Sequence, residues 1–260
     1  MMALLMRNEK IIGVVGGVGP YAGLDLVRKI FDQTVADSDQ QHLPVALLSL
    51  PSRIEPRTEY LLGNVKTNPA GAVSEIIIQL TKLGAAAVGI PCNTMFAGPI
   101  FDVILEKLRA ARCPLTPVHM IKKTAEYVRD NHPEIKKAGL LCTWGTYQSN
   151  IYPDCLEPQG LQVIVPDEKI RKEVVHQVIL DPDYGIKAQS HPVTAKARRQ
   201  LLQVIEDLQA QGAQAVILGC TELPLAIPEN KIGSTIIIDP TLILARTLIN
   251  LVAPEKLKPL

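Results

Sequence analysis

The chain has 260 residues, of which 47% are hydrophobic and 20% are charged, as in ordinary globular proteins. Its 27 lysines and arginines almost balance its 26 acidic residues, so the net charge is +1, and the sequence contains no dense basic run. This balance argues against nucleic acid and anionic membrane surfaces as partners and favours a small molecule.

Nothing in the sequence indicates export or membrane insertion. Residues 1–7 have no cationic region ahead of their apolar residues, and that apolar run is too short for a signal peptide. No stretch approaches the roughly 18 apolar residues of a membrane span. The five cysteines are odd in number and lack C-x-x-C spacing, which argues against a disulfide framework and a zinc site. We therefore expect a cytoplasmic protein.

Strand-like and helix-like segments alternate along the chain. Short apolar runs predict strands at 11–15, 45–50, 86–90, 137–142, 161–165, 214–218 and 234–238. Longer stretches, several starting at proline or after a capping residue, predict helices at 21–35, 69–82, 99–111, 121–131, 167–178, 192–211 and 241–252. This alternation predicts an α/β fold with parallel sheets flanked by helices.

One pattern occurs twice. Cys92 and Cys220 each follow a buried strand, in Pro91-Cys92-Asn93-Thr94 and Gly219-Cys220-Thr221-Glu222, and each lies at a nearly equal distance from an earlier strand and small-residue turn. The repeat predicts two pseudosymmetric Rossmann-like domains. Because open α/β sheets bind ligands at the carboxyl ends of their strands, both thiols are expected to face one interdomain cleft.

The repeat also suggests where the domains divide. We assign 1–116 plus 226–260 to the first domain, which carries the first cysteine, and 117–225 to the second, which carries the other. In this division the chain crosses back after the second cysteine turn. The strand and helix predicted over 234–252 would then finish on the first domain.

The paired cysteines are the strongest candidates for chemistry. A free thiol has a pKa near about 8.5, and only its thiolate is a good base or nucleophile. A single free cysteine is often a small buried hydrophobe. Two cysteines in matched positions favour a functional interpretation, with one thiol on each side of a substrate.

Three cations could accompany the thiols. Arg53 and Arg57 lie in the loop after the strand at 45–50, where a guanidinium could grip a carboxylate, and we rank Arg57 ahead of Arg53. Lys187 lies in a turn-rich stretch of the second half and could supply another cation. The alternative for each is an ordinary solvated surface charge.

Turn residues beside the expected cleft offer polar groups. Asn93, Thr94, Thr146 and Thr221 could bind a carboxylate or cap the helices that follow them. The turn at Gly17 and Val18 allows close backbone approach but lacks the G-x-G-x-x-G spacing of a dinucleotide site. The five histidines show no metal spacing, so no metal or cofactor is predicted.

These motifs, with the opening Gly16-Gly17-Val18-Gly19-Pro20, resemble the aspartate/glutamate racemase superfamily, in particular its aspartate racemase branch. The resemblance implies cofactor-independent racemisation in a dimeric, two-domain protein. It assigns catalysis to Cys92 and Cys220, substrate binding to Arg57 and Lys187, and carboxylate and ammonium binding to Asn93, Thr94 and Thr221. Many members continue the first cysteine motif with Ala-His, whereas this chain has Met95-Phe96, which predicts a drier pocket.

Together with this resemblance, the paired cysteines predict a homodimeric racemase that interconverts L- and D-aspartate by two-base proton transfer at Cα, with an acidic amino acid as its partner. The substrate-binding set is Gly17, Val18, Arg53, Arg57, Asn93, Thr94, Thr146, Lys187, Thr221 and Glu222. Three alternatives remain: a broader aspartate/glutamate racemase, a one-cysteine isomerase or decarboxylase, and a non-catalytic binding protein for acidic amino acids.

Overall fold

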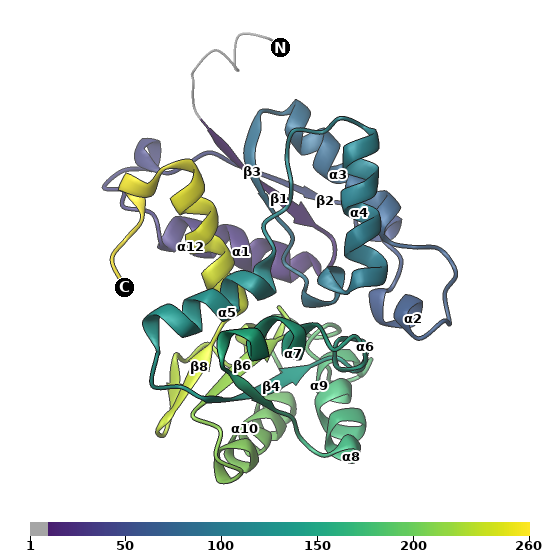
Figure 1. The fold of residues 1–260 in the computed structure, drawn as a ribbon, viewed down its shortest axis with the longest axis vertical. Helices are drawn as coiled ribbons and strands as arrows, with labels where there is room; N and C mark the ends of the chain where they lie inside the picture. Colours follow the sequence, from purple (N-terminus) through teal and green to yellow (C-terminus); the bar gives the residue numbers. More distant parts are fainter. Residues whose placement is uncertain (1–9) are drawn as a thin grey trace.

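The computed structural model describes residues 10–260, so the expectation about residues 1–7 lies outside the described part. Two sheets, one parallel throughout and one parallel except at an edge strand, form two lobes stacked on one another (Figure 1). The first sheet has the order β2-β1-β3, with β1 Ile11–Gly16, β2 Val45–Ser49 and β3 Ala85–Gly89. The α/β fold predicted from the alternating segments is confirmed.

The second sheet has five strands in the order β5-β4-β6-β8-β7. These strands are β4 Lys137–Cys142, β5 Gln162–Ile164, β6 Ala215–Gly219, β7 Lys231–Ile232 and β8 Thr235–Ile238. The order β5-β4-β6 repeats β2-β1-β3, with the first strand of each half in the centre. Each cysteine motif therefore follows the third strand of its half, which explains the sequence repeat.

Helices cover both faces of the first sheet. α1 (Pro20–Asp32) and α12 (Pro240–Val252) lie on one side, and α3 (Ala70–Lys82) and α4 (Gly98–Ala110) on the other (Figure 1). β3 is a small-residue strand that lets α12 pack closely, because a Cβ at Gly89 would lie 2.7 Å from a methyl group of Leu248. The end of the chain is thus fixed to the first lobe.

The second lobe is built in the same way. α5 (Met120–Asn131) and α7 (Ile151–Leu156) lie on the side toward the first lobe, and α10 (Ala195–Ala210) lies on the far side (Figure 1). A broken helical segment, α8 (Glu168–Ile170), a π-helical turn (Arg171–Val175) and α9 (His176–Leu180), replaces the single helix predicted at 167–178.

The predicted return of the chain to the first lobe is wrong for the strand. β8 pairs with β6 through Ala215 and Ile236, so it extends the second sheet. The crossing comes one element later, between β8 and α12, where Asp239 caps the helix by accepting hydrogen bonds from the backbone N–H groups of Thr241 and Leu242. A buried Lys29 of α1 pairs with Asp239 at 2.5 Å and joins this crossing to the first lobe. The division near residue 116 stays a prediction.

Short helices that the sequence did not predict occupy the cleft. α2 (Arg57–Leu61) follows β2, α6 (Trp144–Gln148) follows β4, and α11 (Leu223–Ala226) follows β6. α2 of the first lobe contacts α6 of the second so closely that a Cβ at Gly145 would lie 3.0 Å from Thr58. None of the helices described in residues 10–260 combines the length and apolarity that a membrane span requires.

Candidate active site

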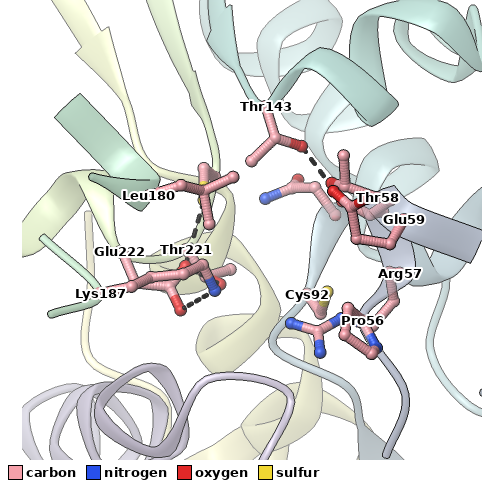
Figure 2. A pocket seen from close by; sticks show the side chains of 13 residues that line it. Pro56, Arg57, Thr58, Glu59, Cys92, Thr143, Leu180, Lys187, Thr221 and Glu222 are labelled. Atoms are coloured by element: carbon pink, nitrogen blue, oxygen red, sulfur yellow. Dashed lines mark hydrogen bonds and ion pairs between the residues drawn. The ribbon is translucent and has the colours of Figure 1, made fainter. Parts of the chain in front are cut away.

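A cavity of about 230 Å³ lies where the carboxyl ends of the strands of both lobes meet. It is smaller than the roughly 300–1,000 Å³ of drug-sized pockets, so its size suits a small ligand. Figure 2 shows Cys92 and Arg57 on one side of the opening, facing Lys187, Thr221 and Glu222 on the other. The cavity is lined by Pro56, Arg57, Thr58, Glu59, Cys92, Asn93, Thr94, Thr143, Leu180, Lys187, Cys220, Thr221 and Glu222.

Both cysteines of the repeat line this cavity as free thiols. Cys92 and Cys220 are only 6% and 7% exposed, so each reaches a ligand only through the pocket. Each follows a strand of a different sheet, β3 for Cys92 and β6 for Cys220, which places the thiols on opposite lobes. The elements after them are a 3₁₀ turn at Asn93–Phe96 and the four-residue α11.

Cys220 is held in its protonated form. Its Sγ donates a hydrogen bond to Glu222 Oε2 at 3.1 Å. Burial raises the pKa of the Cys220 thiol well above its ordinary value, and the negative charge of Glu222 raises it further, although Lys187 opposes both. In the ligand-free protein this residue is therefore a proton donor.

Glu222 joins the thiol to a cation. Its Oε1 lies 2.7 Å from Lys187 Nζ. Burial alone would raise the pKa of Glu222, but Lys187 holds it below its ordinary value. Burial alone would lower the pKa of Lys187, but Glu222 and then Cys220 raise it above its ordinary value. Both members of the pair are thus charged, and the pocket wall carries an ion pair instead of a free lysine.

The glycine turn after β1 makes room for this ion pair. A methyl group at Gly19 would overlap Glu222 Oε1, so the two lobes can contact each other here only because residue 19 has no side chain. Gly17 has φ +83°, a left-handed conformation that favours glycine. Gly17 and Val18, predicted to bind substrate, do not line the cavity.

Arg57 lines the cavity and Arg53 does not. Arg57 is the first residue of α2, and its Nη2 donates to the carbonyl oxygen of Val18 at 2.5 Å, which holds the guanidinium against the glycine turn. Arg53 ends an exposed 3₁₀ turn. Of the two arginines, only Arg57 therefore lies where a guanidinium could bind a ligand carboxylate, as predicted.

Hydroxyl groups of the two lobes meet at one wall of the cavity. Thr94 Oγ1 lies 2.8 Å from Thr146 Oγ1 and 3.5 Å from Thr143 Oγ1, and all three are buried. Thr146 therefore contacts Thr94 and not the cavity itself. On the other side, Thr221 Oγ1 donates to the carbonyl oxygen of Pro91 at 3.0 Å, which ties one cysteine turn to the other.

The side chain of Phe96 points away from the cavity. Its ring packs on those of Phe101 and His119, with centroids 5.1 and 4.7 Å away. Burial lowers the pKa of the partly buried His119 to about 4, so this imidazole is neutral near pH 7. The expected effect of Met95-Phe96 on pocket polarity is therefore not supported, because neither residue lines the cavity.

Sequence reasoning missed five lining residues, namely Pro56, Thr58, Glu59, Thr143 and Leu180. Two of them, Pro56 and Thr58, flank Arg57, and Thr143 directly follows the strand equivalent to β1, so position in the sequence could have indicated these three. Leu180, at the end of α9, carries no sequence signal. Within residues 10–260, no group of three or more His, Cys, Asp or Glu side chains is arranged to hold a metal ion.

Comparison with known proteins agrees with this architecture. The Asp/Glu/hydantoin racemase family model matches residues 15–248. The broad-specificity amino-acid racemase RacX of Bacillus subtilis is 26% identical over 92% of this chain and 97% of its own length.

Solved structures give the same result. An aspartate racemase from Picrophilus torridus superposes with a TM-score of 0.76 at 28% identity, covering 96% of each chain. Glutamate racemase from Francisella tularensis shares the fold, with a TM-score of 0.64 at 19% identity over 95% of this chain and 82% of that one. With most of its length matched by the family model, the chain belongs to the Asp/Glu/hydantoin racemase family.

Proposed function

We propose that this protein is an amino-acid racemase that acts on aspartate without a cofactor, through two bases. The observation that carries the proposal is the meeting of Cys92 and Cys220, one from each lobe, in a single small cavity with Arg57 and Lys187. Two thiols on opposite lobes suit inversion at a carbon centre, because one can remove a proton from one face while the other delivers a proton to the opposite face. The Picrophilus torridus structure to which this chain is similar is also an aspartate racemase.

The chemistry is a proton exchange at Cα. A thiolate on one face removes the Cα proton, and a thiol on the opposite face delivers its own proton to the resulting carbanion, which inverts the centre and leaves the two sulfurs with exchanged protonation states. Because Glu222 and burial keep Cys220 protonated, Cys220 serves as the first acid and Cys92 as the first base. This exchange leaves Cys220 as the thiolate and Cys92 as the thiol, which are the protonation states from which the reverse direction begins.

The substrate carboxylates need donors that are already in place. Arg57 is fixed by its bond to Val18 and is suited to one carboxylate, while the backbone and hydroxyl groups of Thr94 and Thr221 are suited to the negative charge that develops at the other. Lys187 is paired with Glu222 and charged, which does not suit a lysine that must form a Schiff base.

A broader substrate range is the second candidate. RacX, similar over nearly its whole length, is named for broad specificity. The cavity also holds Glu59 beside Arg57, so its wall carries carboxylates as well as cations. Homodimer formation and a cytoplasmic location stay predictions.

Chiral chromatography of each product after incubation with L- and D-aspartate, both glutamates, both asparagines and both lysines tests the proposal. Racemisation confined to aspartate supports it, and conversion of several classes supports the broader racemase. A one-cysteine isomerase or decarboxylase would consume substrate without forming the other enantiomer. A binding protein would return every amino acid unchanged.

A further inference from the structure

Asn93 of the cavity wall has a buried donor with no partner. Its side chain is 2% exposed, and no group among residues 10–260 accepts a hydrogen bond from its Nδ2. Buried polar groups in folded proteins are nearly always paired, so an unpaired donor in a pocket wall indicates a ligand acceptor. The carbonyl oxygen of the same amide, Oδ1, already accepts a hydrogen bond.

The hydrogen-bond partner of this oxygen is Tyr152, whose phenol OH donates to Asn93 Oδ1 at 2.6 Å. Tyr152 lies on α7 of the second half and Asn93 follows β3 of the first, so the bond joins the two halves of the chain. Tyr152 is 1% exposed and does not line the cavity. It therefore acts on a ligand only through Asn93.

The bond fixes which end of the amide faces the cavity. A phenol OH needs an acceptor, and within residues 10–260 the only acceptor recorded for the Tyr152 OH is Asn93 Oδ1. A rotated amide would leave the phenol proton unpaired in the core, which is costly. Burial also raises the pKa of Tyr152 well above its ordinary value, so the phenol remains a donor at any working pH.

We propose that Tyr152 is a positioning residue that locks the Asn93 amide with Nδ2 toward the ligand, so that this site takes a carboxylate oxygen and rejects an ammonium group. The inference rests on the proposed function for its substrate, and what it adds is a residue outside the cavity that fixes the orientation of the Asn93 amide. A carboxylate accepts from Nδ2, whereas an ammonium group has only donors to offer.

The experiment replaces Tyr152 with phenylalanine, which keeps the ring and removes only the hydroxyl. Tyr147→Phe is the matched control, because this partly buried tyrosine bonds to backbone groups of Leu140 and Cys142 and does not line the cavity. KM and kcat for L-aspartate are measured between about pH 6 and 9, and the Kd of succinate, a dicarboxylate without an amine, is measured by calorimetry.

We expect Tyr152→Phe to weaken succinate binding and raise the KM for aspartate by about tenfold, the effect of one lost buried hydrogen bond, and to do so equally across the pH range. The control should change both by less than about twofold. In an Asn93→Ala background, Tyr152→Phe should have no further effect, because the residue acts only through that amide.

Three results would overturn the inference: unchanged succinate binding in Tyr152→Phe, an undiminished effect in the Asn93→Ala background, and no succinate binding by the wild-type protein. Failure of the proposed function looks different. If the wild-type protein does not racemise aspartate but binds succinate in a Tyr152-dependent way, the positioning role stands and the reaction assignment falls.

Discussion

Replacement of Gly19 by alanine tests whether the two lobes must meet without a side chain at this point. The backbone is not the obstacle, because the φ of 163° at Gly19 is extended and open to any residue. The obstacle is the overlap of the new methyl group with Glu222 Oε1. The carboxylate would have to move by about 1 Å or more, and such a displacement within a catalytic site can reduce activity about 100-fold.

The same movement disturbs two contacts at once, the 2.7 Å ion pair with Lys187 and the 3.1 Å hydrogen bond from Cys220. We expect Gly19→Ala to lower kcat/KM about 100-fold and the free energy of unfolding by about 1–3 kcal/mol, as for other overpacked sites. Gly71→Ala on α3 is the control, because a Cβ there meets nothing within 4 Å.

In an open helical position alanine stabilises by up to about 1 kcal/mol relative to glycine, so Gly71→Ala should unfold at slightly higher denaturant concentration with unchanged kinetics. Racemisation rates and urea denaturation of the two variants make the comparison. Wild-type kcat/KM in Gly19→Ala, with or without a stability loss, would show that the position of Glu222 does not matter for the reaction.

Two further predictions concern charged groups of the cavity. Arg57→Ala should raise the KM for aspartate and lower kcat, so that kcat/KM falls about 100-fold, whereas Arg53→Ala should change kcat/KM by less than about twofold. Equal losses of kcat/KM in steady-state assays would mean that both guanidinium groups bind the substrate. Glu222→Gln removes a negative charge beside a thiol whose pKa that charge raises, so the pKa of Cys220 should fall and its alkylation by iodoacetamide at pH 8, followed by peptide mass mapping, should become about tenfold faster. An unchanged alkylation rate would mean that burial alone keeps the thiol protonated.

The repeat explains why much of the fold was predictable. Buried strands such as β3 and β6 are continuous apolar runs, and the matched turns after them indicate matched positions in two sheets. Cys92 and Cys220 could be placed in one cleft because the carboxyl ends of parallel strands meet at one edge.

The pairing of the strands was harder to predict from the sequence. β8 is recognisable as a strand, but the sequence of residues 235–238 does not indicate whether it pairs with β6 or with the first sheet. The sheet that β8 joins depends on where α12 packs. α12 can approach β3 closely only because residue 89 is glycine, and this contact joins Gly89 to Leu248, which are far apart in the sequence.

The short helices of the cleft were missed for a related reason. α2 and α6 have five residues each, too few to show a helical period, and they are held by contacts between the lobes such as that of Thr58 with Gly145. Glu59 reaches the cavity from α2, and Leu180 reaches it from the end of α9. Tyr152 lies one step further away, and only the folded structure shows its bond to Asn93.

The central claim is that Cys92 and Cys220 act as the two bases on opposite faces of the substrate. Its most direct test is racemisation of L- and D-aspartate in D₂O, followed by NMR at Cα, for the wild-type protein, Cys92→Ala, Cys220→Ala and the control Cys155→Ala, whose thiol lies outside the cavity. We predict that the wild-type product carries solvent deuterium at Cα. Each cavity variant should lose racemisation about 1,000-fold or more while keeping its fold, and Cys155→Ala should match the wild type. A product without deuterium, or a cavity variant that racemises at close to the wild-type rate, would contradict the two-base account.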